Sequence, residues 1–457
     1  MAILPVLSPL ALSRELLEFA RVFKDAGHSL YFVGGAIRDS LLGRRASDFD
    51  AATDAGPEAV VALFRRVIPT GIKHGTVTVL WRGQEIETTT FRSEAGYSDG
   101  RHPDHVRFGV SIEEDLARRD FTINAMAYEP FERRIVDPHG GAADLRACLI
   151  RAVGTASERF DEDGLRILRA ARFASQLGFQ IEAATLSAMA LRGAAVESLS
   201  PERVRDELSK TLMSPNPSRG LRILEDTGIL ARILPELAEG RGVEQKGSHV
   251  FDVLDHSLVA LDAAQGGLEL RLAALFHDVG KSRAKAIGAD GVPTFHRHEE
   301  ISATMTEGAL RRLRYPNATI DSVVHLVAQH MFNYNDSWSD GAVRRFVARV
   351  GRESLEGLYA LRRADATGMT GSGTEGRNLG ALRARVEEVL AADSTLGLKD
   401  LAIGGKELAD IGVPRGPVMG RMLAELLEAV LDDPALNTPG RLIEIAGLMK
   451  GKHGLGP

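Results

Sequence analysis

Residues 33–50 read VGGAIRDSLLGRRASDFD, and this stretch decides how the amino-terminal third of the chain folds. An apolar strand leads directly into the pair Gly34 and Gly35, and a helical segment follows. Without side chains, these glycines let backbone N–H groups approach phosphate oxygens, and the start of the helix adds a favourable dipole. The pattern predicts a turn that cradles phosphate, although a plain strand-to-helix turn carries the same glycine pair.

Two carboxylates stand at the end of this stretch. Asp48 and Asp50 flank Phe49, so on a strand their side chains emerge from the same face. Such a pair suits Mg²⁺, which in phosphoryl transfer holds the triphosphate and stabilises the leaving pyrophosphate. Glu87 lies in the alternating run QEIETTTFR and is a candidate third ligand, with an exposed strand glutamate as the equal alternative.

A third motif is EEDLARRDFTINAMA at residues 113–127, in which Asn124 follows Asp120 by one helical turn. The planar fork of Arg119 suits a triphosphate, because it is always charged and bonds two oxygens at once. Asn124 can read a sugar hydroxyl. A structural salt bridge is the competing interpretation.

The fourth motif, EDGLRILRAAR at residues 162–172, is interpreted as one helix. Steps of three residues then place Asp163, Arg166 and Arg169 on neighbouring rows of that helix. An acceptor beside a donor fork can pair with the Watson–Crick edge of cytosine or adenine. On spacing alone, a surface ion pair explains the same residues.

The motifs GGAIRD, DFD, ETTTFR, YSDGRHP, RRDFTINAMA and EDGLRILRAARF follow one another over roughly residues 30–230. In this order they resemble the class II tRNA nucleotidyltransferase and bacterial poly(A) polymerase family. The resemblance implies an α+β fold, in which a nucleotidyltransferase head with a five-stranded mixed sheet precedes an all-α neck, body and tail. It also implies that the segment between Phe91 and Phe108 is a loop that switches the site from C to A addition.

The resemblance assigns roles to single residues. Asp163 and Arg166 would select the base, and Arg169 and Arg172 would contact base or phosphate. The motif PERVRDELSKTL at residues 201–212 would support the neck, with Glu202 and Arg203 in structural roles. The full expected set of nucleotide-binding residues is Gly34, Gly35, Arg38, Arg119, Asp120, Asn124, Asp163, Arg166, Arg169 and Arg172.

A second constellation lies further along the chain and resembles an HD-domain phosphohydrolase. It contains DVLDHSL, AALFHDVGK, FHRHEEIS, VAQHMF and RRADATG. Histidine nitrogens and aspartate oxygens suit Mn²⁺, Ni²⁺, Fe or Mg²⁺. The expected ligands are His256, His277, Asp278 and Asp365, with His298 and His330 for a second metal.

Composition sets the domain plan. A chain of 457 residues is longer than one hydrophobic core usually organises, so several domains are expected. Glycine-containing passages at residues 239–249 and 366–380 suggest domain boundaries. We expect a catalytic head at residues 1–150, a neck at 151–245 for nucleotide selection and RNA binding, an HD-type domain at 246–370 and a helical tail at 371–457.

The whole-chain charge of −6 requires phosphate binding to rely on locally clustered arginines. The single Cys148, the lack of a secretory signal and the lack of about 18 consecutive apolar residues predict a cytoplasmic protein with no membrane partner. The sequence leaves the oligomeric state open.

The sequence therefore predicts a Mg²⁺-dependent enzyme that adds CCA to the 3′ end of tRNA from CTP and ATP. A poly(A) polymerase or A-adding enzyme would use the same head. A third hypothesis makes the HD phosphohydrolase primary, with the head as a nucleotide-binding domain.

Overall fold

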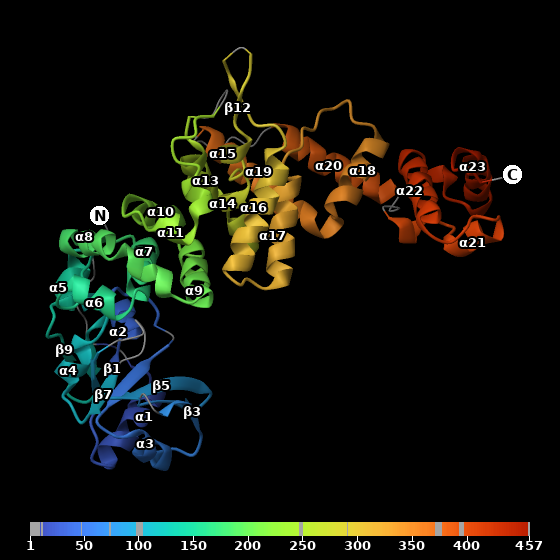
Figure 1. Ribbon diagram of the computed structural model, residues 1–457. Coiled ribbons are helices and arrows are strands. Elements are labelled where there is room, and N and C mark those ends of the chain that lie inside the picture. The colour runs from blue at the N-terminus through green and yellow to red at the C-terminus, as the bar shows by residue number, and fades with distance from the viewer. Residues whose placement is uncertain are drawn as a thin grey trace. The chain divides into compact units, whose positions relative to one another are not determined.

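The structure is a computed structural model that describes residues 10, 12–46, 48–72, 75–96, 104–245, 250–289, 291–370, 377–392 and 397–455. The chain divides into two compact units (Figure 1). The first contains Met1–Ala238 with Arg312–Arg314, and the second contains Glu239–Arg311 and Tyr315–Pro457.

The first unit begins with a mixed sheet of seven strands in the order β3-β4-β5-β2-β1-β8-β9. Its strands are β1 (Leu30–Val33), β2 (Asp50–Thr53), β3 (Val67–Gly71), β4 (Thr76–Trp81), β5 (Gln84–Thr90), β8 (Ala127–Glu129) and β9 (Arg134–Val136). Strands β2 and β5 run parallel, and the other neighbouring pairs are antiparallel. The α+β class expected from the sequence is confirmed.

The sheet has seven strands where the resemblance implies five, and its edge pairs are β3 with β4 and β9 with β8. Apolar residues at helical spacing predict a helix over residues 57–67, but α3 (Pro57–Leu63) ends earlier. Phe64 takes extended backbone and stacks on Phe19 at 5.1 Å, so the chain turns into β3 instead.

Short helices surround this sheet. Ser13 caps α1 (Arg14–Asp25) by accepting a hydrogen bond from the N–H of Leu16, and the buried Phe19 and Phe23 lie on its inner face. The others are α2 (Gly35–Leu41), α4 (Ile112–Ala117), the 3₁₀ turn η2 (Thr122–Asn124) and α5 (Gly141–Arg146). A separate hairpin, β6 (Arg92–Ala95) with β7 (His105–Phe108), flanks residues 97–103 of the expected switching loop, which lie outside the described residues.

Helices make up most of the rest of the first unit. They are α6 (Ala156–Glu162), α7 (Leu165–Leu177), α8 (Ala183–Leu191), η3 (Gly193–Ser198), α9 (Pro201–Leu212), α10 (Pro217–Asp226), α11 (Leu230–Ile233) and α12 (Pro235–Ala238). A parallel strand pair, β10 (Leu149–Ile150) and β11 (Gln180–Ile181), joins them. Both α9 and α10 pack against α7, which makes α7 the central helix of this layer.

Where the structure describes it, the second unit has helices and one small hairpin of β12 (Ala286–Ile287) and β13 (Pro293–Thr294). Its first helices are α13 (Val253–Ala263), α14 (Leu268–Phe276), α15 (Lys281–Ala284), α16 (His298–Arg312), α17 (Asn317–Gln329), α18 (Asp340–Val350), η4 (Arg352–Ser354) and α19 (Leu355–Thr370). Gly368 lets α19 approach α13, because a Cβ there would lie 2.9 Å from the His256 ring.

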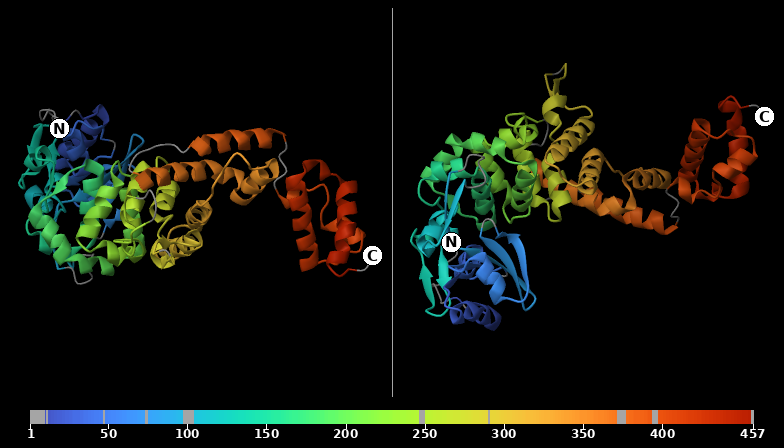
Figure 2. Two further views of the ribbon diagram at one scale, coloured as in Figure 1. Left: turned by 90° about the horizontal axis from the view of Figure 1, so that it is seen from above. Right: turned by 60° about the horizontal axis from the view of Figure 1, so that its bottom comes forward.

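The chain continues through α20 (Arg377–Ala392) to a final helical cluster, drawn in red in Figure 2. The cluster contains η5 (Leu398–Asp400), α21 (Gly405–Asp410), α22 (Pro417–Asp432), η6 (Pro434–Leu436) and α23 (Pro439–Lys452). It has its own apolar core, which includes the buried Leu408, Met422, Leu426 and Leu442. Among the described helices, none is long and apolar enough to cross a membrane.

Candidate active site and metal cluster

At the turn after β1, the Asp50 carboxylate and the Arg119 guanidinium lie beside the glycine backbone. Gly34 has φ 74°, a conformation that favours glycine, and α2 begins at Gly35. A Cβ at Gly34 would lie 3.3 Å from Arg119 Nη1 and 3.8 Å from Asp50 Oδ2. A side chain here would crowd both groups, so the glycine keeps the space beside them open.

Asp50 is electrostatically coupled to the other expected ligands. It opens β2, and the parallel pairing of Ala51 with Thr88 puts Glu87 beside it on β5. Although Asp50 keeps contact with solvent, partial removal of water and repulsion by Glu87 and Asp48 raise its pKa to about 6, against the opposing charge of Arg119. A cation at this edge would relieve that repulsion.

Asp48, Asp50 and Glu87 do not form a closed ligand set in the structure. Within the described part of the chain, the groups of three or more donors whose atoms all lie within 4.8 Å of one another belong to the second unit. The head therefore presents neighbouring acidic side chains that have not converged on one point.

A hydrogen-bonded chain runs from α2 to α7. Arg38 Nη1 donates to Asn124 Oδ1 at 2.7 Å, and Asn124 Nδ2 donates to Asp120 Oδ1 at 3.1 Å. Asp120 Oδ2 then accepts from Arg169 Nε at 2.8 Å and pairs with Arg169 Nη2 at 2.7 Å. Burial alone would raise the pKa of Asp120, but Arg169 and Asn124 hold it below its usual value.

The expected helical turn from Asp120 to Asn124 is wrong. Helix α4 ends at Ala117, Phe121 is extended, and a 3₁₀ turn covers Thr122 to Asn124. The two side chains still meet, because Asp120 Oδ1 also accepts the N–H of Phe121 at 2.7 Å and so turns back over the 3₁₀ segment.

The expected single helix across residues 162–172 is also wrong, because the chain breaks between α6 and α7. Asp163 has extended backbone, and Gly164 begins the next helix. A Cβ at Gly164 would lie 2.5 Å from the carbonyl oxygen of Ala195, so this close approach requires glycine.

Because of this break, the two expected base-selecting residues, Asp163 and Arg166, do not lie on the surface of one helix. Arg166 pairs with Glu162 and donates to the carbonyl oxygens of Arg159 at 3.0 Å and Arg118 at 3.1 Å. Asp163 instead pairs with Arg203 at 2.7 Å. The structure therefore places different partners on Asp163 and Arg166.

Sequence reasoning missed two buried carboxylates behind the arginines. Asp115 Oδ2 pairs with Arg119 Nη2 at 3.3 Å, and Glu207 Oε2 accepts from Arg172 Nε at 2.6 Å. Asp115 lies four residues before Arg119, so helical spacing could have identified it. Glu207 lies on α9, far along the chain from Arg172, and no local pattern connects the two.

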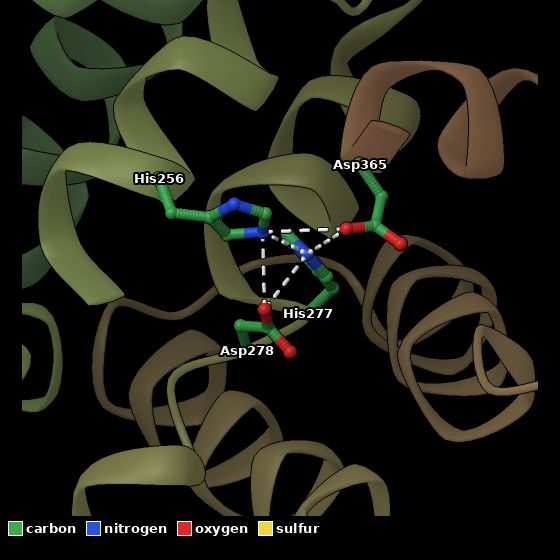
Figure 3. A group of neighbouring side chains, drawn as sticks. All are labelled: His256, His277, Asp278 and Asp365. Carbon is green, nitrogen blue, oxygen red and sulfur yellow. Dashed lines mark hydrogen bonds and ion pairs between the residues drawn. The ribbon is translucent and has the colours of Figure 1, made fainter. Parts of the chain in front are cut away.

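The second unit holds a compact metal-ligand cluster (Figure 3). His256 Nε2 lies 3.0 Å from Asp278 Oδ2 and 3.3 Å from Asp365 Oδ1, and the corresponding distances from His277 Nε2 are 3.3 and 3.5 Å. Donors around one ion at about 2.1 Å stand about 3.0–3.4 Å apart, so these separations fit a shared divalent ion.

A second group uses the other oxygen of the same aspartate. Asp278 Oδ1 lies 3.1 Å from His298 Nε2 and 3.6 Å from His330 Nε2. Both ring nitrogens are buried and have no hydrogen-bond partner of suitable geometry among the described residues. Nitrogens left in this way are suited to a cation, and all six expected ligands belong to these two groups.

Backbone carbonyls orient three of the rings. The Nδ1 atoms of His277, His298 and His330 lie 2.9, 2.9 and 2.7 Å from carbonyl oxygens three residues earlier. Since a carbonyl only accepts, Nδ1 carries the proton and Nε2 is turned toward the cluster. Burial alone would lower the pKa of His277, but the carboxylates of Asp278 and Asp365 raise it to about 10.

A cavity of about 500 Å³ opens beside this cluster. Asp278, His298, His330 and Asp365 line it together with Lys281 and Arg362. Lys281 Nζ donates to Asp278 Oδ2 at 2.6 Å, and Arg362 Nη1 donates to Asp365 Oδ2 at 2.6 Å. The cavity therefore combines metal ligands with two cationic side chains.

Three family descriptions match the chain. Residues 30–151 match the poly A polymerase head domain, residues 178–240 match the probable RNA and SrmB-binding site of polymerase A, and residues 248–370 match the HD domain. Nucleotidyltransferase heads and HD domains both use divalent metal ions. Fold and site thus define a nucleotidyltransferase joined to an HD domain.

Similar proteins identify the family more closely. The CCA-adding enzyme of Lactobacillus johnsonii is 34% identical over 432 residues, covering 94% of this chain and 96% of that protein. The crystal structure of the Bacillus stearothermophilus CCA-adding enzyme in complex with CTP is 30% identical with a TM-score of 0.73, covering 96% and 98% of the two chains. The chain belongs to the CCA-adding enzyme family.

A more distant structure supports the fold alone. The Thermotoga maritima CCA-adding enzyme complexed with tRNA is 18% identical with a TM-score of 0.59, covering 96% of each chain. The family resemblance expected from the motifs is therefore confirmed, and it extends well beyond residues 30–230.

Proposed function

We propose that this chain adds C, C and A to the 3′ end of tRNA, with CTP and ATP as donors and no nucleic-acid template. The observation that carries the proposal is the Gly34 turn, where an added Cβ would lie within 4 Å of the Asp50 carboxylate and the Arg119 guanidinium. Its near full-length similarity to CCA-adding enzymes supports the same reaction.

In the head, Asp48 and Asp50 would hold Mg²⁺, with Glu87 as a third acidic group. The ion supplies charge neutralisation of the triphosphate and makes the attacking 3′-hydroxyl more acidic. The backbone N–H of Gly35 would face the phosphates, whereas the N–H of Gly34 donates to the carbonyl oxygen of Met126 at 3.4 Å.

Arginines would complete the nucleotide pocket. Arg119, held by the buried Asp115, would bind phosphate oxygens, and Asn124 would read a sugar hydroxyl. Arg38, Asp120 and Arg169 would keep Asn124 in place through the hydrogen-bonded chain between α2 and α7.

Asp163 and Arg166 would select the base, and Arg172 would contact base or phosphate. Asp163 would accept a hydrogen bond from the amino group of cytosine or adenine, and Arg166 would donate to the neighbouring ring nitrogen. Uracil and guanine present a carbonyl oxygen and an N–H at these positions, so both contacts would be lost. Arg166 must leave Glu162 to reach the base.

The test uses tRNA that lacks its 3′ terminus. It is incubated with CTP alone, ATP alone or both, and products are resolved to single nucleotides. Growth by three nucleotides that needs both donors supports the proposal. Long products with ATP alone would instead support a poly(A) polymerase, and single additions of ATP only to tRNA ending in CC would support an A-adding enzyme.

A second activity is favoured by the His–Asp cluster. We propose that His256, His277, Asp278 and Asp365 hold one divalent ion, and that His298 and His330 with Asp278 hold another, drawn from Ni, Mn, Fe or Mg. Such ions polarise a phosphate and lower the pKa of water. Lys281 and Arg362 would receive the anionic substrate.

This activity is tested with nucleoside 2′,3′-cyclic phosphates and phosphate monoesters after loading with each metal. Hydrolysis should disappear in His277→Ala and persist in His325→Ala, because His325 bonds the carbonyl oxygen of Val350, outside the cluster. Equal rates in both variants would reject the assignment.

We further propose that the head, neck, HD domain and tail occupy residues 1–150, 151–245, 246–370 and 371–457. The family matches to residues 30–151, 178–240 and 248–370 support these boundaries. We also propose a cytoplasmic location, since tRNA would be the substrate.

A further inference from the structure

We propose that Arg203 on α9 is a positioning residue for nucleotide selection. It fixes the Asp163 carboxylate in the orientation that accepts a hydrogen bond from the amino group of cytosine or adenine. The inference rests on the proposed function, and it changes the purely structural role that the sequence suggested for Arg203.

Both oxygens of Asp163 are held. Oδ1 accepts the N–H of Leu165 at 3.0 Å, and Oδ2 accepts Arg203 Nη2 at 2.7 Å. The Arg203 and Asp163 side chains keep 21% and 19% of their surface exposed, so the pair is shielded but still in contact with solvent. The carboxylate is therefore held through both oxygens and remains partly exposed.

The backbone below this carboxylate is fixed as well. Asp163 is the C-terminal cap of α6, with φ −153° and ψ 105°. Its N–H donates to the carbonyl oxygen of Arg159 at 3.4 Å, and its carbonyl oxygen accepts the N–H of Arg166 at 3.0 Å. The approach of Gly164 to the carbonyl oxygen of Ala195 sets the junction between the two helices. The side chain is held by the N–H of Leu165 at one oxygen and by Arg203 at the other.

Helix α9, which carries Arg203, is itself held against α7. Glu207 stands one turn after Arg203 on α9, and its buried carboxylate bonds Arg172 on α7 at 2.6 Å. On the same side of α9, Glu207 thus contacts α7, and Arg203, one turn earlier, contacts the α6–α7 junction. The backbone that carries Arg203 is therefore held close to the α6–α7 junction.

The chemistry explains why a cation is needed there. An ionised carboxylate only accepts hydrogen bonds, and each oxygen has two lone pairs. Arg203 and Leu165 use one lone pair on each oxygen, which leaves acceptors for a base amino group. Because the carboxylate oxygens offer only lone pairs, a carbonyl oxygen of uracil or guanine meets repulsion there. Arg203 would act on the base only through Asp163.

The experiment compares Arg203→Gln and Arg203→Lys with the wild-type chain. Arg192→Gln is the matched control, because Arg192 forms an exposed pair with Asp161 in the same helical layer. Single-turnover addition to tRNA lacking its 3′ terminus is measured with CTP and UTP, and addition to tRNA ending in CC is measured with ATP and GTP. Thermal unfolding of each variant is recorded alongside.

We expect Arg203→Gln to lower kcat/KM for CTP and ATP mainly through KM, and to narrow the CTP:UTP and ATP:GTP ratios by about tenfold or more. Arg203→Lys should recover part of the ratio, because it keeps one charged donor. Arg192→Gln should match the wild type.

The ratios distinguish positioning from a structural role. If Arg203→Gln and Arg203→Lys lower the rates with right and wrong nucleotides in parallel, or leave the ratios unchanged, the inference is overturned. If Arg203→Gln fails to fold, the ratios of Arg203→Lys decide. Failure of the wild-type chain to add CTP and ATP would instead reject the proposed function.

Discussion

Replacing Glu207 with alanine should destabilise the first unit strongly. The Glu207 side chain is 4% exposed and is bonded to Arg172 Nε at 2.6 Å, with Arg169 Nη1 at 3.9 Å. Removing the carboxylate leaves the Arg172 guanidinium buried without its counter-charge. Breaking a buried ion pair in this way costs about 3–5 kcal/mol.

The lower end of that range applies here, because Arg172 keeps two other contacts. Its Nη1 donates to Gln176 Oε1 at 2.9 Å, and its guanidinium lies 4.2 Å from the centre of the Phe173 ring. A loss of about 3 kcal/mol corresponds to a fall in melting temperature of about 6–12 °C for a unit of this size.

The assay is calorimetric unfolding of the full chain, with the transition of the first unit identified by its shift when CTP is added. Glu197→Ala is the control, because its pair with Arg232 is exposed and worth about 0–1 kcal/mol. The double variant Glu207→Leu with Arg172→Met should recover stability, since apolar side chains of similar volume replace both charges. Equal melting temperatures for Glu207→Ala and Glu197→Ala would refute the reasoning.

Three further outcomes are expected. Because the pKa of Asp50 is raised to about 6 and the ionised form holds the cation, the rate of CMP addition at low Mg²⁺ should fall about tenfold when the pH is lowered from 7 to 5. More Mg²⁺ should move the midpoint of this pH profile to lower pH, and a midpoint insensitive to Mg²⁺ would contradict the prediction. Asp48→Ala should abolish nucleotide addition and spare HD-site hydrolysis, whereas His277→Ala should do the reverse; loss of both activities in one variant would show that the sites are not independent. Gly164→Ala should cost about 1–3 kcal/mol in urea unfolding, because its Cβ would lie 2.5 Å from the carbonyl oxygen of Ala195, and an unchanged midpoint would mean that the junction relaxes freely.

Local patterns predicted what depends on neighbours in the sequence. Alternation predicts the strand in QEIETTTFR, which is β5, and the apolar run before Gly34 predicts β1 and the turn that follows it. The motif order predicted the family, which the comparisons confirm. The grouping of His256, His277, Asp278 and Asp365 in space also agrees with the sequence pattern.

Features that depend on distant contacts were not predictable in this way. The helix break at Asp163 arises because Gly164 must pass the carbonyl of Ala195, which belongs to a later turn. The partner of Asp163 is Arg203, 40 residues further on, and not the nearby Arg166. Helical spacing describes one helix at a time and contains no information about which helix packs behind it.

The three carbonyl-anchored rings of the HD cluster have a consequence for how an ion enters. His277, His298 and His330 cannot rotate without giving up a backbone hydrogen bond, so the chain sets their directions before any ion arrives. Little conformational entropy then remains to be lost on loading. Selectivity between metals should accordingly follow the fixed spacing of the nitrogens more than the adaptability of the side chains.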